Sequence, residues 1–573
     1  MQLNHFDIAV VVIYLVATLG LGIAQAMKIR TSGDYYAGGR TFNKFYLMMH
    51  ALGTASHADE PVSVIGGAFE KGMSGIWYTF LYLPLTPLFW LMAPFIRRTR
   101  FVTTADFFPA RYNRSLGILY AVMGVLKMSV SIGVVLKGTA TIMRSASGGA
   151  IDEKWSILAM TLVFMTYGFA GGLRATVVTE VIQGPLIIVM SLLMLPFGLH
   201  AAGGFAGLHH ALPKAMFSLT MVAGGKDGAE FTPAWVAAMT LVALIGFIAQ
   251  PGLLAAFASG KTELEGRVGY TYGTMIKRGC AIGWVLTGVI LAAMDAQGHL
   301  SPGQSVQVHQ RRELAFGTAM QALLPHGLMG LMFAAIFASQ MATLSAQMVN
   351  SSALASRNLY RGVFRPAATD HQVLWFGRIA GVFLVGIGVY LALALDSVAT
   401  ALTMLLEFTS IMGVIMWAGV LWRRANSAGA WAGVCVLFVV WFLLGPPGML
   451  LKQSIGAVHA PAFLGHYGQK QDVPDLMLRY LPPGILALVV VSLLTKPQSK
   501  KQLDNFYLLL RTPVGQEQIL IDAGVPVVYS GSHQANALET RYPALVHWGG
   551  ALLAAVLCVM FLGVLYAVSW LGG

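Results

Sequence analysis

One apolar stretch, long enough to cross a membrane, carries polar and charged side chains at its centre. It covers residues 45–70, and its middle reads ALGTASHADEPVSVIGG, with His57, Asp59, Glu60 and Pro61. Polar groups are costly inside a bilayer, and backbone leaves helical geometry there only where protein or a cavity surrounds it. We therefore expect the helix to break here and to offer backbone carbonyls and carboxylates to a cation or a solute.

A second apolar stretch, residues 235–257, is interrupted in the same way. Gln250, Pro251 and Gly252 lie at its centre, in the sequence GFIAQPGLLAAF. Two interrupted helices at matching places in two halves of a chain are typical of transporters built from inverted repeats, which bind their substrates near the midplane. The pair of breaks therefore predicts a transporter. The Gln250 amide, which can both donate and accept hydrogen bonds, is a candidate solute ligand.

Hydroxyl side chains that could complete a cation site occur in a later apolar stretch. Ser339, Ala342 and Thr343 are spaced so that they share one helix face. A cation without its water shell needs oxygen ligands, and two hydroxyls could supply them beside the free carbonyls of Ser56 and Asp59. The alternative is that these hydroxyls bond their own helix or pack between helices, which is common in membranes. The nearby break favours the ion site.

One lysine lies near the middle of a predicted membrane helix, in the apolar stretch 116–143. A charge at that depth needs a partner, and the candidates for Lys127 are Asp59, Glu60, Glu407 or a carboxylate of the solute. His57 and Glu60 either line the cavity at the first break or cap the broken helix. The candidate solute-binding residues are thus His57, Glu60, Lys127, Gln250 and Glu407.

The composition predicts an integral membrane protein with many spans. The 573 residues are 56% hydrophobic and 11% charged, whereas soluble domains carry about 25% charged residues. About fourteen apolar stretches approach the roughly 20 residues that a spanning helix needs, and one of them is residues 279–296. With the N-terminus outside, most lysines and arginines fall in loops predicted to be cytoplasmic, so the net charge of +13 indicates topology and not nucleic-acid binding. We expect a multi-pass protein of the inner (plasma) membrane.

The order of the stretches predicts four parts. A leading helix and linker occupy 1–43, and a first five-helix repeat occupies 44–200. An outer loop and a second five-helix repeat follow at 201–424, inverted because each repeat has an odd number of helices. Three accessory helices lie in 425–573, with a polar connection at 496–542 that supports a packing or regulatory segment and no catalytic domain. No nucleotide, nucleophile or metal motif is present, so we do not expect an enzyme.

Six motifs give the chain a family resemblance. It resembles the sodium/solute symporter family, which includes bacterial proline, pantothenate and sialic acid transporters and the sodium/glucose cotransporters. The resemblance implies an all-α polytopic membrane protein with a LeuT-type 5+5 inverted repeat, about fourteen transmembrane helices and alternating access. The motifs, in chain order, are DYYAGGR at 34–40, TTADFFPARY ending at 112, GGLRATVVTEVIQ at 171–183, AQPGLLAAFASGK at 249–261, the ATLSAQ…NLY run, and GVLWRRANSAGA at 419–430.

The resemblance also implies a sodium site and shows where this chain departs from its relatives. Carried over by position, the site falls on the backbone of Ser56 and Asp59 and on Ser339, Ala342 and Thr343. Ala342 stands where a hydroxyl is usual. Asp59 stands where an apolar residue usually contributes only its carbonyl, so its carboxylate could ligate sodium or carry a proton.

A further cation site is known in some members, near an acidic residue of the fifth core helix. Glu180 occupies that position here, and Ser345 is the hydroxyl that remains nearby, so these two form a possible second ion site.

The expected function is sodium-coupled symport of a small polar organic solute, with an amino acid or carboxylate favoured. The implied partners are the solute, Na⁺ as coupling ion and the lipid bilayer, with no other cofactor. Three alternatives stay open: a sugar or polyol as the solute, proton coupling on the same fold, and a solute sensor that does not transport.

Overall fold

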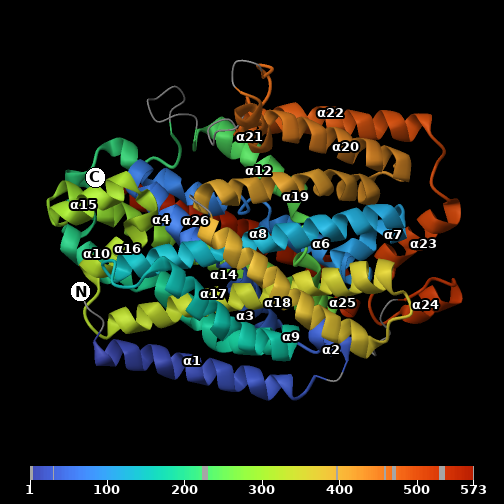
Figure 1. Ribbon diagram of the computed structural model, residues 1–573, viewed down its shortest axis with the longest axis horizontal. Helices are drawn as coiled ribbons and strands as arrows, with labels where there is room; N and C mark the ends of the chain where they lie inside the picture. The colour runs from blue at the N-terminus through green and yellow to red at the C-terminus, as the bar shows by residue number, and fades with distance from the viewer. Residues whose placement is uncertain are drawn as a thin grey trace.

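The computed structural model describes residues 4–29, 31–221, 230–394, 398–456, 460–466, 473–527 and 536–571. Helices dominate these ranges, and within them the one strand-like pairing is an isolated bridge between Phe42 and Gly260. Nine of the described helices are long and apolar enough to cross a membrane. The long helices lie side by side along one axis, with both termini at the end that carries α15 (Pro302–Gln310) (Figure 1).

Both predicted interruptions are present. The first divides one span into α3 (Lys44–Ala55) and α4 (Asp59–Lys71), and the second divides another into α12 (Pro233–Phe247) and α13 (Leu253–Ala258). The other long helices are α1 (His5–Ala26), α6 (Thr86–Arg98), α8 (Arg114–Ala146), α9 (Glu153–Leu192), α14 (Glu263–Ala296), α17 (Leu328–Ala353), α18 (Asp370–Ala394), α19 (Val398–Leu421), α20 (Ser427–Leu444), α22 (Val473–Leu494) and α26 (Gly550–Trp570).

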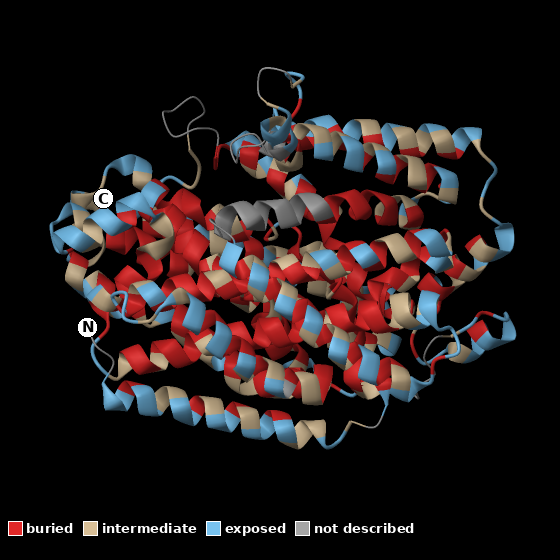
Figure 2. Ribbon diagram, viewed as in Figure 1, coloured by how far each residue is buried: buried red, intermediate tan, exposed pale blue. Residues whose placement is uncertain are grey.

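Large apolar side chains are exposed on the helices at the periphery of the bundle. Examples are Ile13 on α1, Phe383 on α18 and Leu552 on α26, each about two-thirds exposed at 68%, 68% and 66%. Burial is concentrated in the middle of the bundle, and α1 and α22 lie at its edges with much of their surface exposed (Figure 2). Such an apolar belt is what a bilayer requires of the helices that face it.

One predicted boundary is wrong, and the error matters for the site. The sequence interpretation begins a span at Gly279, after the adjacent charges of Lys277 and Arg278. The structure instead has one continuous helix, α14, that begins at Glu263. Lys277 therefore lies roughly 21 Å into the helix at 1.5 Å per residue, and both cations are buried. Two adjacent charges do not end this helix because Glu60 accepts from Lys277, and the carbonyls of Tyr82 and of Thr274 in the same helix accept from Arg278.

A glycine divides α9 into two helices. At Gly172 the backbone has φ 52° and ψ −149°, a conformation open essentially to glycine alone. Tyr35 packs closely against it: a Cβ atom on Gly172 would lie 2.5 Å from the ring carbon Cδ2 and 2.6 Å from the carbonyl oxygen of Tyr35.

We predict that Gly172→Ala lowers the free energy of unfolding by at least about 1–3 kcal/mol, because the backbone is strained and Tyr35 must move. Gly386→Ala is the matched control. That glycine lies inside α18 with no atom near its missing Cβ, so alanine should be neutral or stabilising by up to about 1 kcal/mol. Denaturation of both variants in detergent checks this, and equal stability would contradict it.

Candidate functional site

The first break exposes backbone carbonyls to another helix. Ser56 ends α3 with φ −98° and ψ 70°, which is outside helical geometry, and α4 begins three residues later at Asp59. The Ser56 amide still closes the last turn of α3, because it donates to the carbonyls of Leu52 and Gly53 at 3.1 and 3.3 Å. Its own carbonyl points away from the helix. At the break, the Ser56 amide thus stays hydrogen-bonded within α3, while the Ser56 carbonyl oxygen is free to face another helix.

The hydroxyls predicted on α17 face this break. Ser339 Oγ donates a hydrogen bond to the carbonyl oxygen of Ser56, and Thr343 Oγ1 donates to the carbonyl of Gly53 at 3.3 Å. Ser339 and Thr343 are buried, and the methyl group of Ala342 lies against Gly53. Two hydroxyl and two carbonyl oxygens therefore gather where α17 crosses the break, and the methyl group of Ala342 takes the place of a third hydroxyl.

Asp59 adds a buried carboxylate at the start of α4. Its side chain is fully buried, and neither carboxylate oxygen has a hydrogen-bond partner among the described residues. The ring nitrogen Nδ1 of His57 lies 3.6 Å from Oδ1. Gly138 of α8 lets α4 approach closely, because a Cβ there would be 3.0 Å from the Asp59 Cα.

This donor set suits an alkali cation. Among the described residues, no three His, Cys, Asp or Glu side chains come together, as a transition-metal site would require. Carbonyl, hydroxyl and carboxylate oxygens replace the hydration shell of hard cations. The buried Ser56 hydroxyl and the Asp59 carboxylate have no hydrogen-bond partner among the described residues, so both still have capacity to bind.

Glu180, proposed for a second ion site, has a different neighbour. One carboxylate oxygen lies 2.5 Å from Nδ1 of His50, and both side chains are buried. The other oxygen has no hydrogen-bond partner in the described part and lies beside Gly53. Ser345 Oγ donates to the carbonyl of Ala342 in its own helix at 3.2 Å. Glu180 thus adjoins the first ion site, and the ring of His50 occupies one of its two carboxylate oxygens.

The second break is held by hydroxyls from the first half of the chain. Tyr120 on α8 donates to the carbonyl of Ala249 at 2.7 Å, and Thr104 lies 3.4 Å from the carbonyls of Gln250 and Pro251. The Gln250 side chain donates to the Tyr82 hydroxyl at 3.2 Å. The freed carbonyls are thus satisfied by protein, and the glutamine amide is held at the wall of a cavity.

A cavity of about 210 Å³ lies between the two breaks. The predicted residues His57, Asp59, Glu60, Lys127 and Gln250 all line it, as does Thr343 of the ion site. The side chain of Glu407 lies outside the described residues. The cavity is also lined by residues that sequence reasoning did not select, including His50, Tyr82, Lys277, Arg278 and Asn350.

The partner of Glu60 is Lys277, not Lys127. The Lys277 ammonium on α14 lies 2.6 Å from Oε1 of Glu60, and both groups are largely buried. Among the described residues, no carboxylate lies within ion-pair distance of Lys127, so the expected pairs with Asp59 and Glu60 do not form. Arg278 binds backbone carbonyls, those of Thr274 at 2.9 Å and Tyr82 at 3.1 Å.

Comparisons with known proteins agree with this geometry. The model of the sodium:solute symporter family matches residues 35–436. The sodium/pantothenate symporter of Haemophilus influenzae is 25% identical over 461 residues, which cover 77% of this chain and 90% of that protein. The sodium/proline symporter of Salmonella typhimurium is 24% identical, over 75% of this chain and 86% of that one. The structure of a Na⁺-coupled sialic acid symporter matches with a TM-score of 0.71 at 17% identity, covering 87% of this chain and 99% of that chain.

The two broken helices, the cavity between them and this structural match show that the protein has the LeuT fold. The chain belongs to the sodium:solute symporter family. It is a multi-pass membrane transporter and not an enzyme. The exact number of transmembrane helices stays a prediction.

We predict that Lys277→Met destabilises the protein by about 3–5 kcal/mol, because it leaves the Glu60 carboxylate buried without its ammonium. Adding Glu60→Leu should recover most of that loss, since the double variant removes both charges. Denaturation in detergent measures both. A double variant whose loss equals the sum of the two single losses would show that the charges are not coupled.

Proposed function

We propose that this chain carries a small solute with a carboxylate group, an amino acid or another organic acid, into the cell together with sodium. The observation that carries the proposal is the first break: carbonyls of Gly53 and Ser56 meet the hydroxyls of Ser339 and Thr343 beside the cavity. A sodium ion bound there would hold α17 against the break. Solute binding next to it then depends on the ion, as symport requires.

Sodium supplies enough free energy for nutrient uptake. A membrane potential contributes roughly 2.3 kcal/mol per charge per 100 mV, and a tenfold ion gradient adds about 1.4 kcal/mol. One sodium ion per solute therefore supports an accumulation of roughly 500-fold.

The charge balance of the cavity favours an anionic or zwitterionic solute. Its described lining contains three cations, Lys127, Lys277 and Arg278, and two carboxylates, Asp59 and Glu60. Because Lys277 is paired with Glu60 and Arg278 bonds to carbonyls, Lys127 is the cation best able to bind a solute carboxylate. Gln250 can hydrogen-bond a second polar group. The relatives named above for pantothenate and proline transport are consistent with such a solute.

Asp59 has two roles in this proposal. Its carbonyl belongs to the ion site, and its carboxylate brings a negative charge close to the bound sodium.

Glu180 and Ser345 form the possible second ion site, in which His50 competes with a cation for the Glu180 carboxylate. We place the N-terminus outside on the distribution of Lys and Arg. We assign residues 44–200 to the first five-helix repeat, and residues 201–424 to an outer loop and the second, inverted repeat, because each repeat opens with a broken helix.

Thr343→Ala should raise the sodium concentration for half-maximal stabilisation by roughly tenfold, the equivalent of about 1.4 kcal/mol. The probe is sodium alone, compared with potassium at equal ionic strength in a thermal-shift titration. Ser351→Ala is the control, since that buried hydroxyl lies on the same helix and donates to the carbonyl of Met348 in its own helix at 3.0 Å. If both variants respond to sodium like the wild type, Thr343 is not a ligand.

Lys127→Gln should weaken binding of the solute at least tenfold while leaving stabilisation by sodium alone in place. The solute comes from a screen of amino acids, other carboxylates, sugars and nucleosides, each tested in sodium and in potassium. A sugar that stabilises the protein best would favour the alternative substrate class.

Transport assays in proteoliposomes distinguish the two remaining alternatives, proton coupling and a solute sensor that does not transport. Uptake driven by a pH gradient without sodium would favour proton coupling, and binding without counterflow would favour a sensor. Undiminished binding of a carboxylate solute by Lys127→Gln would remove Lys127 from the site.

A further inference from the structure

Two glutamines on α17 form hydrogen bonds to α8 in similar ways. Gln347 Nε2 donates to the Ser131 hydroxyl at 2.9 Å, and Gln340 Oε1 accepts from the Thr139 hydroxyl at 2.5 Å. Gln347 is 8% exposed and Gln340 is fully buried. The two glutamines are seven residues apart, close to two helical turns, so they lie on the same face of α17. Each side chain thus uses one half of its amide to join the two helices.

The two glutamines differ in their relation to the cavity. Gln347 lines the cavity between the two breaks, whereas Gln340 is not among the described residues that line it. The other half of the Gln347 amide, Oε1, accepts no hydrogen bond from the described residues. Asp59 is the other described lining residue whose buried side-chain oxygens have no partner, and we assign Asp59 to the ion site. Gln347 therefore leaves one hydrogen-bond acceptor beside the solute cavity.

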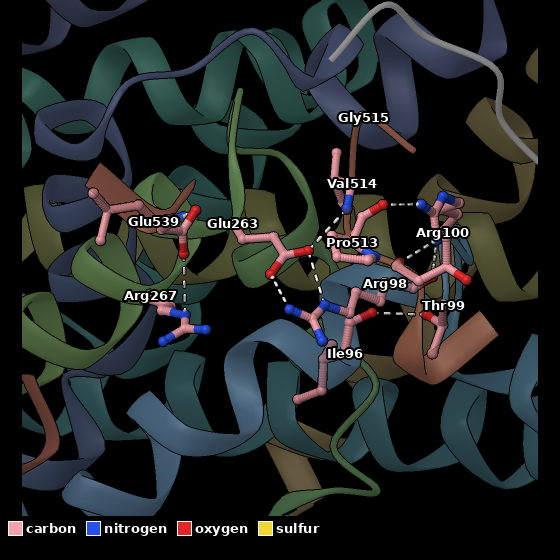
Figure 3. Close-up of polar contacts among 12 residues, drawn as sticks. Ile96, Arg98, Thr99, Arg100, Glu263, Arg267, Pro513, Val514, Gly515 and Glu539 are labelled. Atoms are coloured by element: carbon pink, nitrogen blue, oxygen red, sulfur yellow. Dashed lines mark hydrogen bonds and ion pairs between the residues drawn. The ribbon is translucent and has the colours of Figure 1, made fainter. Parts of the chain in front are cut away.

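Glu263, the first residue of α14, shows how a buried acceptor is otherwise satisfied. Its carboxylate accepts two hydrogen bonds from Arg98 and one from the backbone amide of Val514, each at 2.9 Å (Figure 3). Such pairing is the rule for buried polar atoms, because an unpaired one costs free energy. Gln347 Oε1 departs from that rule, and a bound molecule that donates a hydrogen bond to it would remove the cost.

Gln347 connects the proposed ion site to the proposed carboxylate site. On α17 it follows Thr343 by four residues, which is about one helical turn or roughly 6 Å. On α8 its partner Ser131 follows Lys127 by the same spacing, and residues four apart share a helix face. All four residues line the cavity. They form one polar wall that runs from a sodium ligand to the lysine available for a solute carboxylate.

We infer that Gln347 determines specificity by selecting solutes that carry an N–H or O–H donor beside their carboxylate. About one helical turn separates Lys127 from Ser131, so a small solute can contact both the lysine and the amide that Ser131 holds. Amino acids and 2-hydroxy acids share this chemistry. An unsubstituted carboxylic acid lacks the donor and leaves the buried Oε1 unpaired, which disfavours its binding. The inference rests on the proposed function for the carboxylate at Lys127, and it adds the second group of the solute.

The test compares compounds that share a carbon skeleton and differ in one group. Each set contains an L-amino acid, the corresponding L-2-hydroxy acid and the unsubstituted acid, on the skeletons of alanine, leucine and phenylalanine. Every compound is titrated in sodium and in potassium, and its concentration for half-maximal thermal stabilisation is measured. In the wild type, the better donor compound of a set should bind at least about tenfold more tightly than the unsubstituted acid. Whether the amino or the hydroxy acid binds more tightly identifies the donor.

Gln347→Met should reduce that preference to less than about threefold, because methionine is unbranched like glutamine and its thioether accepts hydrogen bonds only weakly. Binding of the unsubstituted acids and stabilisation by sodium alone should persist. Gln340→Met is the matched control: it also removes a hydrogen bond between α17 and α8, but away from the described cavity lining, so the preference should stay at the wild-type value. A purely structural role of Gln347 would weaken binding of all three compounds in a set equally.

Ser131→Ala gives a second variant that removes a single hydroxyl. The Gln347 amide then loses the partner that orients it, so part of the preference should disappear. A wild-type preference in both Gln347→Met and Ser131→Ala would overturn the inference, and so would an equal loss of preference in Gln340→Met. Unsubstituted acids that bind the wild type as tightly as their partners would also overturn it, while leaving the proposed symport of a carboxylate in place. If no compound stabilises the wild type in sodium, the proposed function fails as well.

Discussion

A bilayer supplies no water to an unpaired backbone carbonyl, and this constraint explains how both helix breaks persist. Each break frees carbonyls at membrane depth, and the opposite half of the chain provides hydroxyls for them. Ser339 donates a hydrogen bond to the carbonyl of Ser56, and Tyr120 donates one to the carbonyl of Ala249. The two halves of the chain therefore contact each other at the breaks through these hydrogen bonds. If the halves move apart, an ion, a solute or water must replace the hydroxyl groups at the freed carbonyls.

Buried charged side chains likewise find their partners on other helices. Glu60 and Lys277 neutralise each other between α4 and α14, and His50 faces Glu180 between α3 and α9. A paired charge can remain inside a membrane protein, whereas an unpaired one marks a place for a ligand. Among the described residues, the Asp59 carboxylate accepts no hydrogen bond and Lys127 has no carboxylate within ion-pair distance, so these are the groups through which ion and solute would act on the protein.

The sequence predicted the positions of the breaks because proline, glycine and charged residues interrupt apolar runs in ways that few other structures produce. It predicted the hydroxyl face of α17 from helical periodicity, and the structure confirms that Ser339 and Thr343 meet the break. It failed at Lys277 and Arg278, because two adjacent charges are usually a loop signal. Lys277 pairs with Glu60 on α4, and Arg278 donates to the carbonyls of Tyr82 in a distant turn and of Thr274 in its own helix. Hydropathy along the chain contains no information about the contacts with Glu60 and Tyr82. The sequence predicts that the polar connection at 496–542 is a packing or regulatory segment, but the ion pairs of Glu517 with Arg100 and of Glu539 with Arg267 depend on the fold.

The account depends on sodium holding α17 to the first break, and hydrogen–deuterium exchange measures that contact directly. In sodium, compared with potassium at equal ionic strength, exchange at residues 53–60 and at the facing turn of α17 should slow, while the distant α22 is unchanged. Equal exchange in the two salts at residues 53–60 would contradict a sodium site at this break.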